Sequence, residues 1–186
     1  MSHETGFLKC GRSYEGSAGP DLRAVLLGRK AQYAPDRTFD TMHVRIELDL
    51  SLRDKTAAGV CTTTVRAFHD AVRELSFDAM EMRDVSVHFA GKPCRHKYDG
   101  KKLIVRLPKA LKAGEEGVVS VRYKLTQPRS GLHFIDASPS NGPQVWSQSQ
   151  PEDARYWFPC HDAPQEKATS EILATVPKGF SAVSNG

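Results

Sequence analysis

The amino-acid sequence predicts an all-β protein, an antiparallel sandwich or barrel, and three observations lead to this class. Short runs of alternating or β-branched apolar residues recur from about residue 39 to the end of the chain. Turns containing glycine or proline separate most of these runs. Segments with the period of an amphipathic helix are nearly absent. Many short strands punctuated in this way are typical of sandwiches and barrels.

The first strand is the clearest element. Its apolar residues alternate strictly with polar ones, as a half-buried strand requires, and they are Met42, Val44, Ile46, Leu48 and Leu50. The segment "RDKTAAG" then forms a turn into "VCTTTVRAF", which is rich in β-branched residues. The two segments therefore predict a β-hairpin.

Further strands follow at short intervals. Asp99-Gly100 stands in the hairpin position between two of them, and "KAGEEG" precedes a long strand that starts near Val118. The strands that we expect cover residues 74–79, 84–90, 95–99, 102–108, 117–125, 131–136, 144–148, 171–177 and 180–185.

Residues 1–38 lack this pattern and are interpreted as an extended N-terminal arm, followed by one domain over residues 39–186. The start of the chain has no signal or transit peptide, and no apolar run is long enough to span a bilayer, so we expect a cytoplasmic protein with no membrane partner. Four cysteines lie far apart without a C-x-x-C pair, and reduced thiols are expected.

Basic residues gather between Lys92 and Lys112, where eight of them accompany a single acid, Asp99. One interpretation is a nucleic-acid surface. The other is a solvated hairpin edge, whose lysines prevent pairing with other sheets. We favour the edge, since Tyr98 is the only aromatic residue there that could stack on a base.

The sequence contains none of the common motifs for zinc binding, nucleophilic catalysis or phosphate binding. The seven histidines never form H-x-x-x-H, and there is neither a G-x-S-x-G elbow nor a glycine-rich phosphate loop. His161 stands beside Asp162, but neighbours on an extended chain point in different directions, so we do not favour a general base there. The sequence predicts no catalytic residue, no metal ligand and no cofactor in this chain.

One stretch, "WSQSQPEDARYWFPCHDAP" over residues 146–164, fits neither a helix nor a strand. With the residues that follow, it resembles the end of the N-terminal domain in the zinc aminopeptidase family of aminopeptidase N, puromycin-sensitive aminopeptidase and leukotriene hydrolase. The family motifs are matched by Gln148-Ser149-Gln150, Arg155, Phe158-Pro159-Cys160-His161-Asp162-Ala163-Pro164, Lys167-Ala168-Thr169 and Val183-Ser184-Asn185-Gly186.

The resemblance implies a saddle-like β-sandwich that packs on a thermolysin-like catalytic domain. That domain, with its zinc and its G-x-M-E-N and H-E-x-x-H motifs, is not in this sequence, so the chain alone is expected to be inactive. The resemblance places Gln148 and Gln150 against the α-amine of a peptide N-terminus. Gln150 stands where aminopeptidase N has Glu, whereas leukotriene hydrolase also has Gln.

The neighbours of the two glutamines are expected to support the loop. Trp146, Trp157 and Phe158 are interpreted as core or interface residues, with an exposed apolar patch near Trp157 and Phe158 for docking of the catalytic domain. Arg155 is expected to anchor the loop through Glu152, Asp153 or Asp162. Pro159 and Pro164 are expected to stiffen the turn.

Two other functions stay open. A transcription-initiation subunit related to this family keeps the domain without peptidase activity, so the chain could be a non-catalytic scaffold that binds protein or nucleic acid through residues 92–112. A ligand-binding sandwich unrelated to peptidases is a third interpretation, and it rests on the fold alone.

Overall fold

The computed structural model describes residues 37–184 and confirms an all-β chain. Apart from Arg37 and Thr38, the expected N-terminal arm lies outside the described residues. Among residues 37–184 no helix is long and apolar enough to cross a membrane. In chain order the elements are β1 (Phe39–Ser51), β2 (Thr56–Ala67), β3 (Val72–Asp78), β4 (Arg83–Phe89), β5 (Lys92–Pro93), β6 (Arg95–Tyr98), β7 (Lys102–Leu111), β8 (Glu116–Thr126), β9 (Leu132–Ile135), β10 (Gln144–Ser147), the 3₁₀ turn η1 (Ala154–Tyr156) and β11 (Thr169–Thr175).

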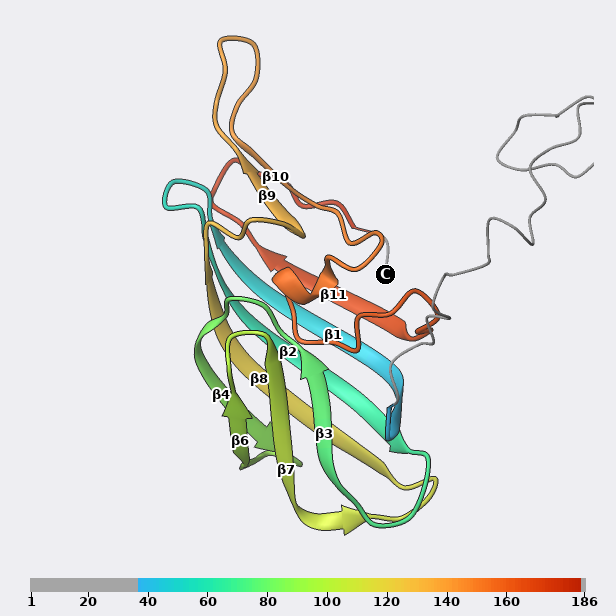
Figure 1. Ribbon diagram of the computed structural model, residues 1–186. Coiled ribbons are helices and arrows are strands. Elements are labelled where there is room, and N and C mark those ends of the chain that lie inside the picture. The colour runs from blue at the N-terminus through green and yellow to red at the C-terminus, as the bar shows by residue number, and fades with distance from the viewer. Residues whose placement is uncertain (1–36, 185–186) are drawn as a thin grey trace, which may run out of the picture. The chain divides into compact units, whose positions relative to one another are not determined.

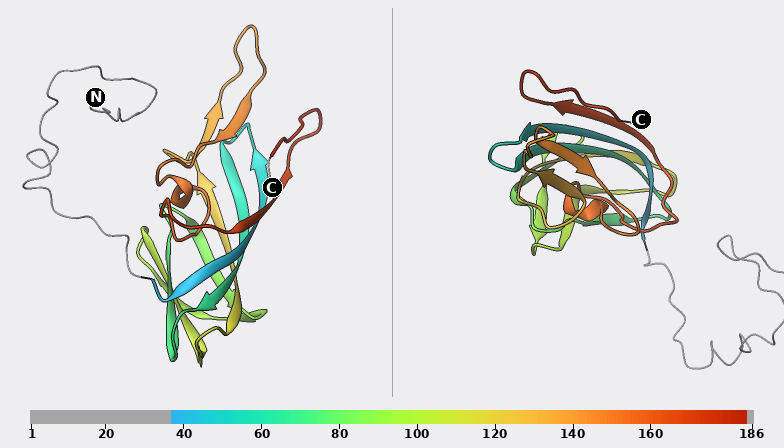
Figure 2. Two further views of the ribbon diagram at one scale, coloured as in Figure 1. Left: turned by 90° about the vertical axis from the view of Figure 1, so that its right-hand side faces the viewer. Right: turned by 90° about the horizontal axis from the view of Figure 1, so that it is seen from above.

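The strands form three sheets. A six-stranded sheet has the order β11-β1-β2-β8-β4-β5, a three-stranded sheet has the order β3-β7-β6, and β9 pairs with β10. The three-stranded sheet and the loop after β10 lie over the same side of the six-stranded sheet, toward opposite ends of its strands (Figures 1 and 2). Of the described pairs, β1 with β11 is parallel and the others are antiparallel.

The core lies between the two larger sheets. In β1, β2, β7 and β8 alternate residues over most of the strand point inward and are almost fully buried, which is the pattern that the sequence predicts. Burying each large side chain contributes about 1.5–3 kcal/mol. The largest of these side chains are Tyr123, Phe39, Phe77, Leu75, Leu103 and Leu125.

The first strand differs from its prediction at one end. Val44, Ile46 and Leu48 are buried as expected, but near the start of the strand Thr41 is buried while Met42 is only partly so. A β-bulge between Thr41 and His43 causes this difference, because one extra residue exchanges the two faces of the strand.

The strand expected at 180–185 is wrong for its described part. Residues 181–184 form no strand, and the N–H of Phe180 donates a hydrogen bond to the carbonyl of Pro177, as in a turn. The other expected strands are confirmed, with ends that shift by a few residues. The turn at Asp99-Gly100 is also confirmed, because Asp99 Oδ1 accepts the backbone N–H groups of Lys101 and Lys102 at 2.8 and 2.7 Å.

Candidate functional site

Gln148 and Gln150 lie just beyond the end of β10, and both are exposed. The backbone of this segment is held in place. The N–H of Gln148 donates to the carbonyl of Gly131 at 2.9 Å, and the carbonyl of Ser149 accepts the N–H of Asp153 at 3.0 Å. The Gln150–Pro151 peptide bond is cis. The site therefore consists of two amide side chains on an anchored backbone.

Ser149 fastens this segment to the core from between the two glutamines. Its hydroxyl accepts a hydrogen bond from the indole N–H of Trp157 at 3.1 Å. Trp157 is 6% exposed, and its own carbonyl accepts the buried hydroxyl of Tyr123 at 2.7 Å. This chain of bonds connects the loop to β8 of the six-stranded sheet.

Gly131 makes room for the loop at the start of β9. Its φ of +76° is in the region that favours glycine, and an added Cβ would lie 2.3 Å from the carbonyl oxygen of Asp153. No pattern in the sequence indicates these roles for Gly131, Ser149 and Tyr123, because each depends on a contact with a residue that the fold brings close: Asp153 for Gly131, and Trp157 for Ser149 and Tyr123.

Arg155 anchors the other end of the loop, as predicted. Its guanidinium bonds Asp162 at 2.8 Å and Glu152 at 2.9 Å, whereas Asp153 makes no ion pair among the described residues. A further partner, Asp78 of β3, lies 3.7 Å away and was not predicted. Burial alone lowers the pKa of Arg155, but the bond to Asp162 and the charge of Asp78 outweigh it, so the pKa is raised and the side chain stays charged.

The residues of the turn "FPCHD" are held by hydrogen bonds and burial, and none of them is an activated catalytic group. Asp78 and Cys160 exchange backbone hydrogen bonds of 2.6 and 3.0 Å. Burial raises the pKa of the Cys160 thiol well above its usual range, so Cys160 is not an activated nucleophile. Burial also lowers the pKa of His161, and the Asp162 carboxylate beside it is engaged by Arg155.

We predicted an exposed apolar patch near Trp157 and Phe158, and this prediction is wrong at Trp157. Its ring is buried and packs edge-on against Phe158, with the ring centroids 4.6 Å apart. Trp146, which we interpreted as a core or interface residue, does not belong to the core, since it is 48% exposed and stacks on His133 at 4.2 Å. Alternation explains the difference, because Trp146 belongs to a two-stranded ribbon with one face open to solvent.

Exposed apolar side chains lie instead along a groove whose lining ends, on β10, directly before Gln148. The groove has a volume of about 370 Å³, and Trp146 and Ser147, directly before Gln148, are among its lining residues. We call this surface the apolar groove. It is lined by Leu48, Leu50, Leu52, Leu132, Val145, Trp146, Ser147, Trp157, Ile172, Ala174, Val176, Phe180, Ser181, Ala182, Val183 and Ser184.

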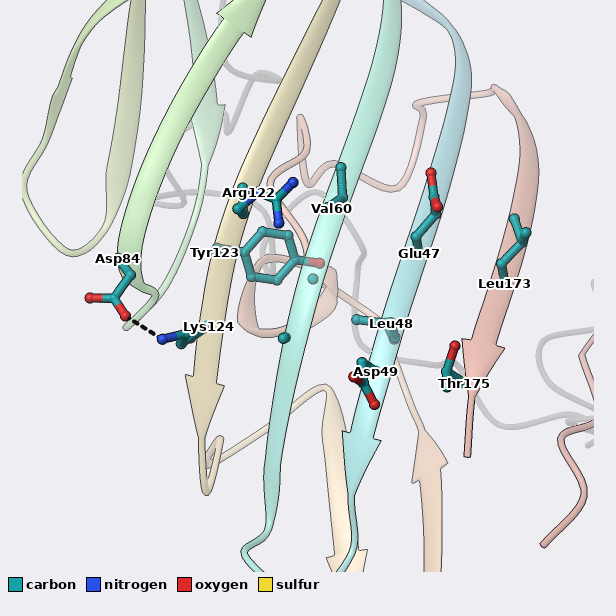
Figure 3. A pocket seen from close by; sticks show the side chains of 12 residues that line it. Glu47, Leu48, Asp49, Val60, Asp84, Arg122, Tyr123, Lys124, Leu173 and Thr175 are labelled. Atoms are coloured by element: carbon teal, nitrogen blue, oxygen red, sulfur yellow. Dashed lines mark ion pairs between the residues drawn. The ribbon is translucent and has the colours of Figure 1, made fainter. Parts of the chain in front are cut away.

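A second hollow, of about 410 Å³, lies on the solvent face of the six-stranded sheet and takes no part in this site. Figure 3 shows acids of β1, Glu47 and Asp49, on one side and bases of β8, Arg122 and Lys124, on the other, with Lys124 paired to Asp84. Its lining contains no Ser, Cys or His that could act as a nucleophile or base.

Zinc does not fit the described side chains. Within residues 37–184, no group of three or more His, Cys, Asp or Glu side chains could hold a metal ion. A catalytic zinc needs about three such ligands, so no metal-dependent step is assigned to these residues.

Curated proteins similar to this chain include a hydrolase and an aminopeptidase. Leukotriene A-4 hydrolase of Xenopus laevis is 25% identical over 162 residues, which cover 82% of this chain and 27% of that protein. Leucine aminopeptidase 2 of Vanderwaltozyma polyspora is 27% identical over 162 residues, covering 81% and 24%. The chain thus spans about a quarter of the length of these relatives.

Solved structures agree. The M1 zinc metallopeptidase of Deinococcus radiodurans is 27% identical with a TM-score of 0.64, covering 76% of this chain and 33% of that one. Native yeast leukotriene A4 hydrolase matches at 22% identity and a TM-score of 0.64, covering 75% and 23%, and supports the fold. A family model described as "Peptidase M1 N-terminal domain" matches residues 38–186. The chain therefore belongs to the family of M1 peptidase N-terminal domains.

Proposed function

We propose that this chain is the N-terminal domain of a cytoplasmic zinc aminopeptidase, and that Gln148 and Gln150 contact the α-ammonium group of a peptide substrate. The observation that carries the proposal is the pair of exposed amide side chains on a backbone held by Gly131, Asp153 and Trp157. A loop that contributes to the active site of another domain has to be held in position beforehand. The Deinococcus enzyme, in a mutant form, has been solved with a Tyr-Ser-Ala substrate.

The chemistry of the two side chains suits an ammonium group. An ammonium has three donors and no acceptor, and each glutamine offers an amide oxygen. Because the ammonium is charged, a hydrogen bond from it to an amide oxygen is charge-assisted, at about 1.5–3 kcal/mol, and an ionised acceptor adds the attraction of its own charge. Two amides therefore orient the substrate, and we propose that the catalytic domain adds the carboxylate that supplies the larger part of the affinity.

The zinc and the catalytic residues belong, in this proposal, to a catalytic domain outside residues 1–186. The apolar groove is the surface that we assign to its docking, because the groove is apolar, exposed and next to Gln148. The chain alone is then inactive, and turnover of an amino-acid anilide by the purified chain would contradict this part.

The amine contact is tested in the full-length protein that carries this domain. The measured quantity is the ratio of affinities for a peptide amide with a free and with an acetylated N-terminus. Gln148→Ala and Gln150→Ala should each lower the ratio several-fold, and Gln150→Glu should raise it unless desolvation of the new carboxylate cancels the gain. Gln144→Ala, an exposed glutamine of β10, is the matched control and should leave the ratio unchanged.

If neither alanine variant changes the affinity for either peptide, the loop is purely structural. If both variants weaken the free and the acetylated peptide equally, the ratio is again unchanged, and the side chains contact another part of the substrate. Either result removes the assignment of Gln148 and Gln150 to the amine.

A further inference from the structure

The basic stretch from Lys92 to Lys112 is the strongest sequence feature that the proposed function does not use. The structure distributes it over β5, β6 and β7. Arg95 and Lys97 of β6 and Arg106 of β7 share one face of the three-stranded sheet, because Arg95 pairs with Arg106 and Lys97 with Ile104. This face points away from the core, since the alternate residues Leu103 and Val105 of β7 are buried.

Arg95 stands directly opposite Arg106 in the ladder. Like charges in this position destabilise a sheet unless an anion compensates them. Glu74 compensates in part, through a bond of 3.0 Å to Nε of Arg106. Among residues 37–184, Arg95 and Lys97 have no ion-pair partner. A row of lysines that merely guards an edge does not need two arginines opposite each other.

The same three cations surround a hollow of about 470 Å³. Its other lining residues are Cys94 and His96, and no carboxylate lines it. The surroundings are partly fixed: the Cys94 thiol donates to the carbonyl of Arg106 at 3.1 Å, and Nδ1 of His96 lies 3.2 Å from the carbonyl of Cys94. Nε of Arg106 donates to the Glu74 carboxylate, while its two terminal nitrogens make no side-chain hydrogen bond or ion pair within residues 37–184.

We propose that this hollow binds a small phosphate-bearing ligand with two or more phosphate groups. Guanidinium forks match phosphate oxygens in pairs, and a lysine adds a point charge. A di- or triphosphate offers a separate anionic group to cations on both strands, and it suits a hollow of about 470 Å³ better than a single phosphate does. The backbone of a nucleic acid offers the same group, but Tyr98 is half-buried and its hydroxyl accepts the backbone N–H of Met82 at 2.8 Å, so the ring is not free to serve as a stacking platform.

The experiment is a calorimetric titration of the chain with sodium triphosphate, with inorganic phosphate and a single-stranded oligonucleotide as further arms. We expect saturable binding of one triphosphate, weaker binding of inorganic phosphate, and loss of affinity as salt is raised. Arg95→Ala and Arg106→Ala should each weaken triphosphate binding about tenfold, which corresponds to about 1.4 kcal/mol. Arg95→Lys keeps the charge but loses the fork, and should weaken binding less than Arg95→Ala.

Arg122→Ala is the matched control, because it removes the same charge from an exposed position on the other sheet. Equal weakening by Arg122→Ala, or a titration that does not saturate, would show a general charge effect and overturn the site. Affinity that grows with oligonucleotide length, without competition by triphosphate, would overturn it in favour of a nucleic-acid surface. The titration tests a hollow on β6 and β7, whereas Gln148 follows β10. A negative result would therefore not contradict the proposed amine contact.

Discussion

Replacing Arg155 with alanine should loosen the loop that carries the two glutamines. The substitution removes the bonds from Nε to Asp162 at 2.8 Å and from the terminal nitrogen to the Asp162 carbonyl at 3.0 Å. It also removes the contacts with Glu152 and Asp78. The Asp162 and Asp78 side chains are only 7% and 9% exposed, so both keep a buried negative charge with fewer partners.

The magnitude follows from what each carboxylate retains. Breaking a fully buried ion pair by removing one partner costs about 3–5 kcal/mol. Asp78 keeps its pair with Lys102 at 2.7 Å, Asp162 keeps the backbone N–H of residue 155 at 3.1 Å, and Arg155 was itself 23% exposed. We therefore expect a loss of roughly 2–3 kcal/mol, below the range for a fully buried pair. For a chain of this size that corresponds to a decrease in melting temperature of roughly 4–12 °C.

The assay is thermal and urea unfolding of the purified chain followed by circular dichroism. Arg66→Ala is the matched control, because it breaks an exposed ion pair, with Asp40 at 3.2 Å, and should cost about 1 kcal/mol or less. If Arg155→Ala costs no more than Arg66→Ala, the Arg155 cluster does not hold the loop and the reasoning is refuted.

Two further substitutions test other supports of the loop. Gly131→Ala should destabilise the chain by more than about 1 kcal/mol in urea unfolding, since its Cβ would lie 2.3 Å from the Asp153 carbonyl at a φ of +76°, while Gly142→Ala meets nothing within 4 Å and should be close to neutral. His161 has a lowered pKa from burial, so the unfolded chain binds its proton more readily and stability falls as the pH drops below about 6.5. His161→Gln should make the loss of stability between neutral pH and pH 5 smaller, and an equal loss in both proteins would contradict this cause.

Local patterns in the sequence predict the strands well because alternation is decided by neighbours along the chain. The run from Val44 to Leu48 has its expected faces, and Asp99-Gly100 makes its hairpin. The bulge at Thr41 and the parallel pairing of β11 with β1 could not be predicted in this way. Both depend on a partner strand, and β11 reaches β1 only after more than a hundred intervening residues.

In the candidate site, too, contacts between residues close in the sequence could be predicted, and contacts with distant residues could not. The Arg155 anchor was predictable since two of its partners lie within seven residues, whereas Asp78 belongs to a strand far earlier in the chain. The different exposures of Trp146 and Trp157 could not be predicted, and the reason is the same for both. Both are aromatic residues in one stretch, but one lies on a two-stranded ribbon and the other beneath the loop, and composition does not distinguish the two environments.

The residues that hold the glutamine segment come from both larger sheets. The position of this short loop therefore depends on the complete sandwich. Asp78 of β3 holds Cys160 through backbone bonds and contacts Arg155, while Tyr123 of β8 holds Trp157. A change in the packing of one sheet on the other would therefore shift the anchors at Arg155 and Cys160 relative to the anchor at Trp157. Because Trp157 bonds Ser149, the positions of Gln148 and Gln150 on either side of Ser149 depend on the complete core, and substitutions in that core should alter the proposed amine recognition even where they touch no substrate.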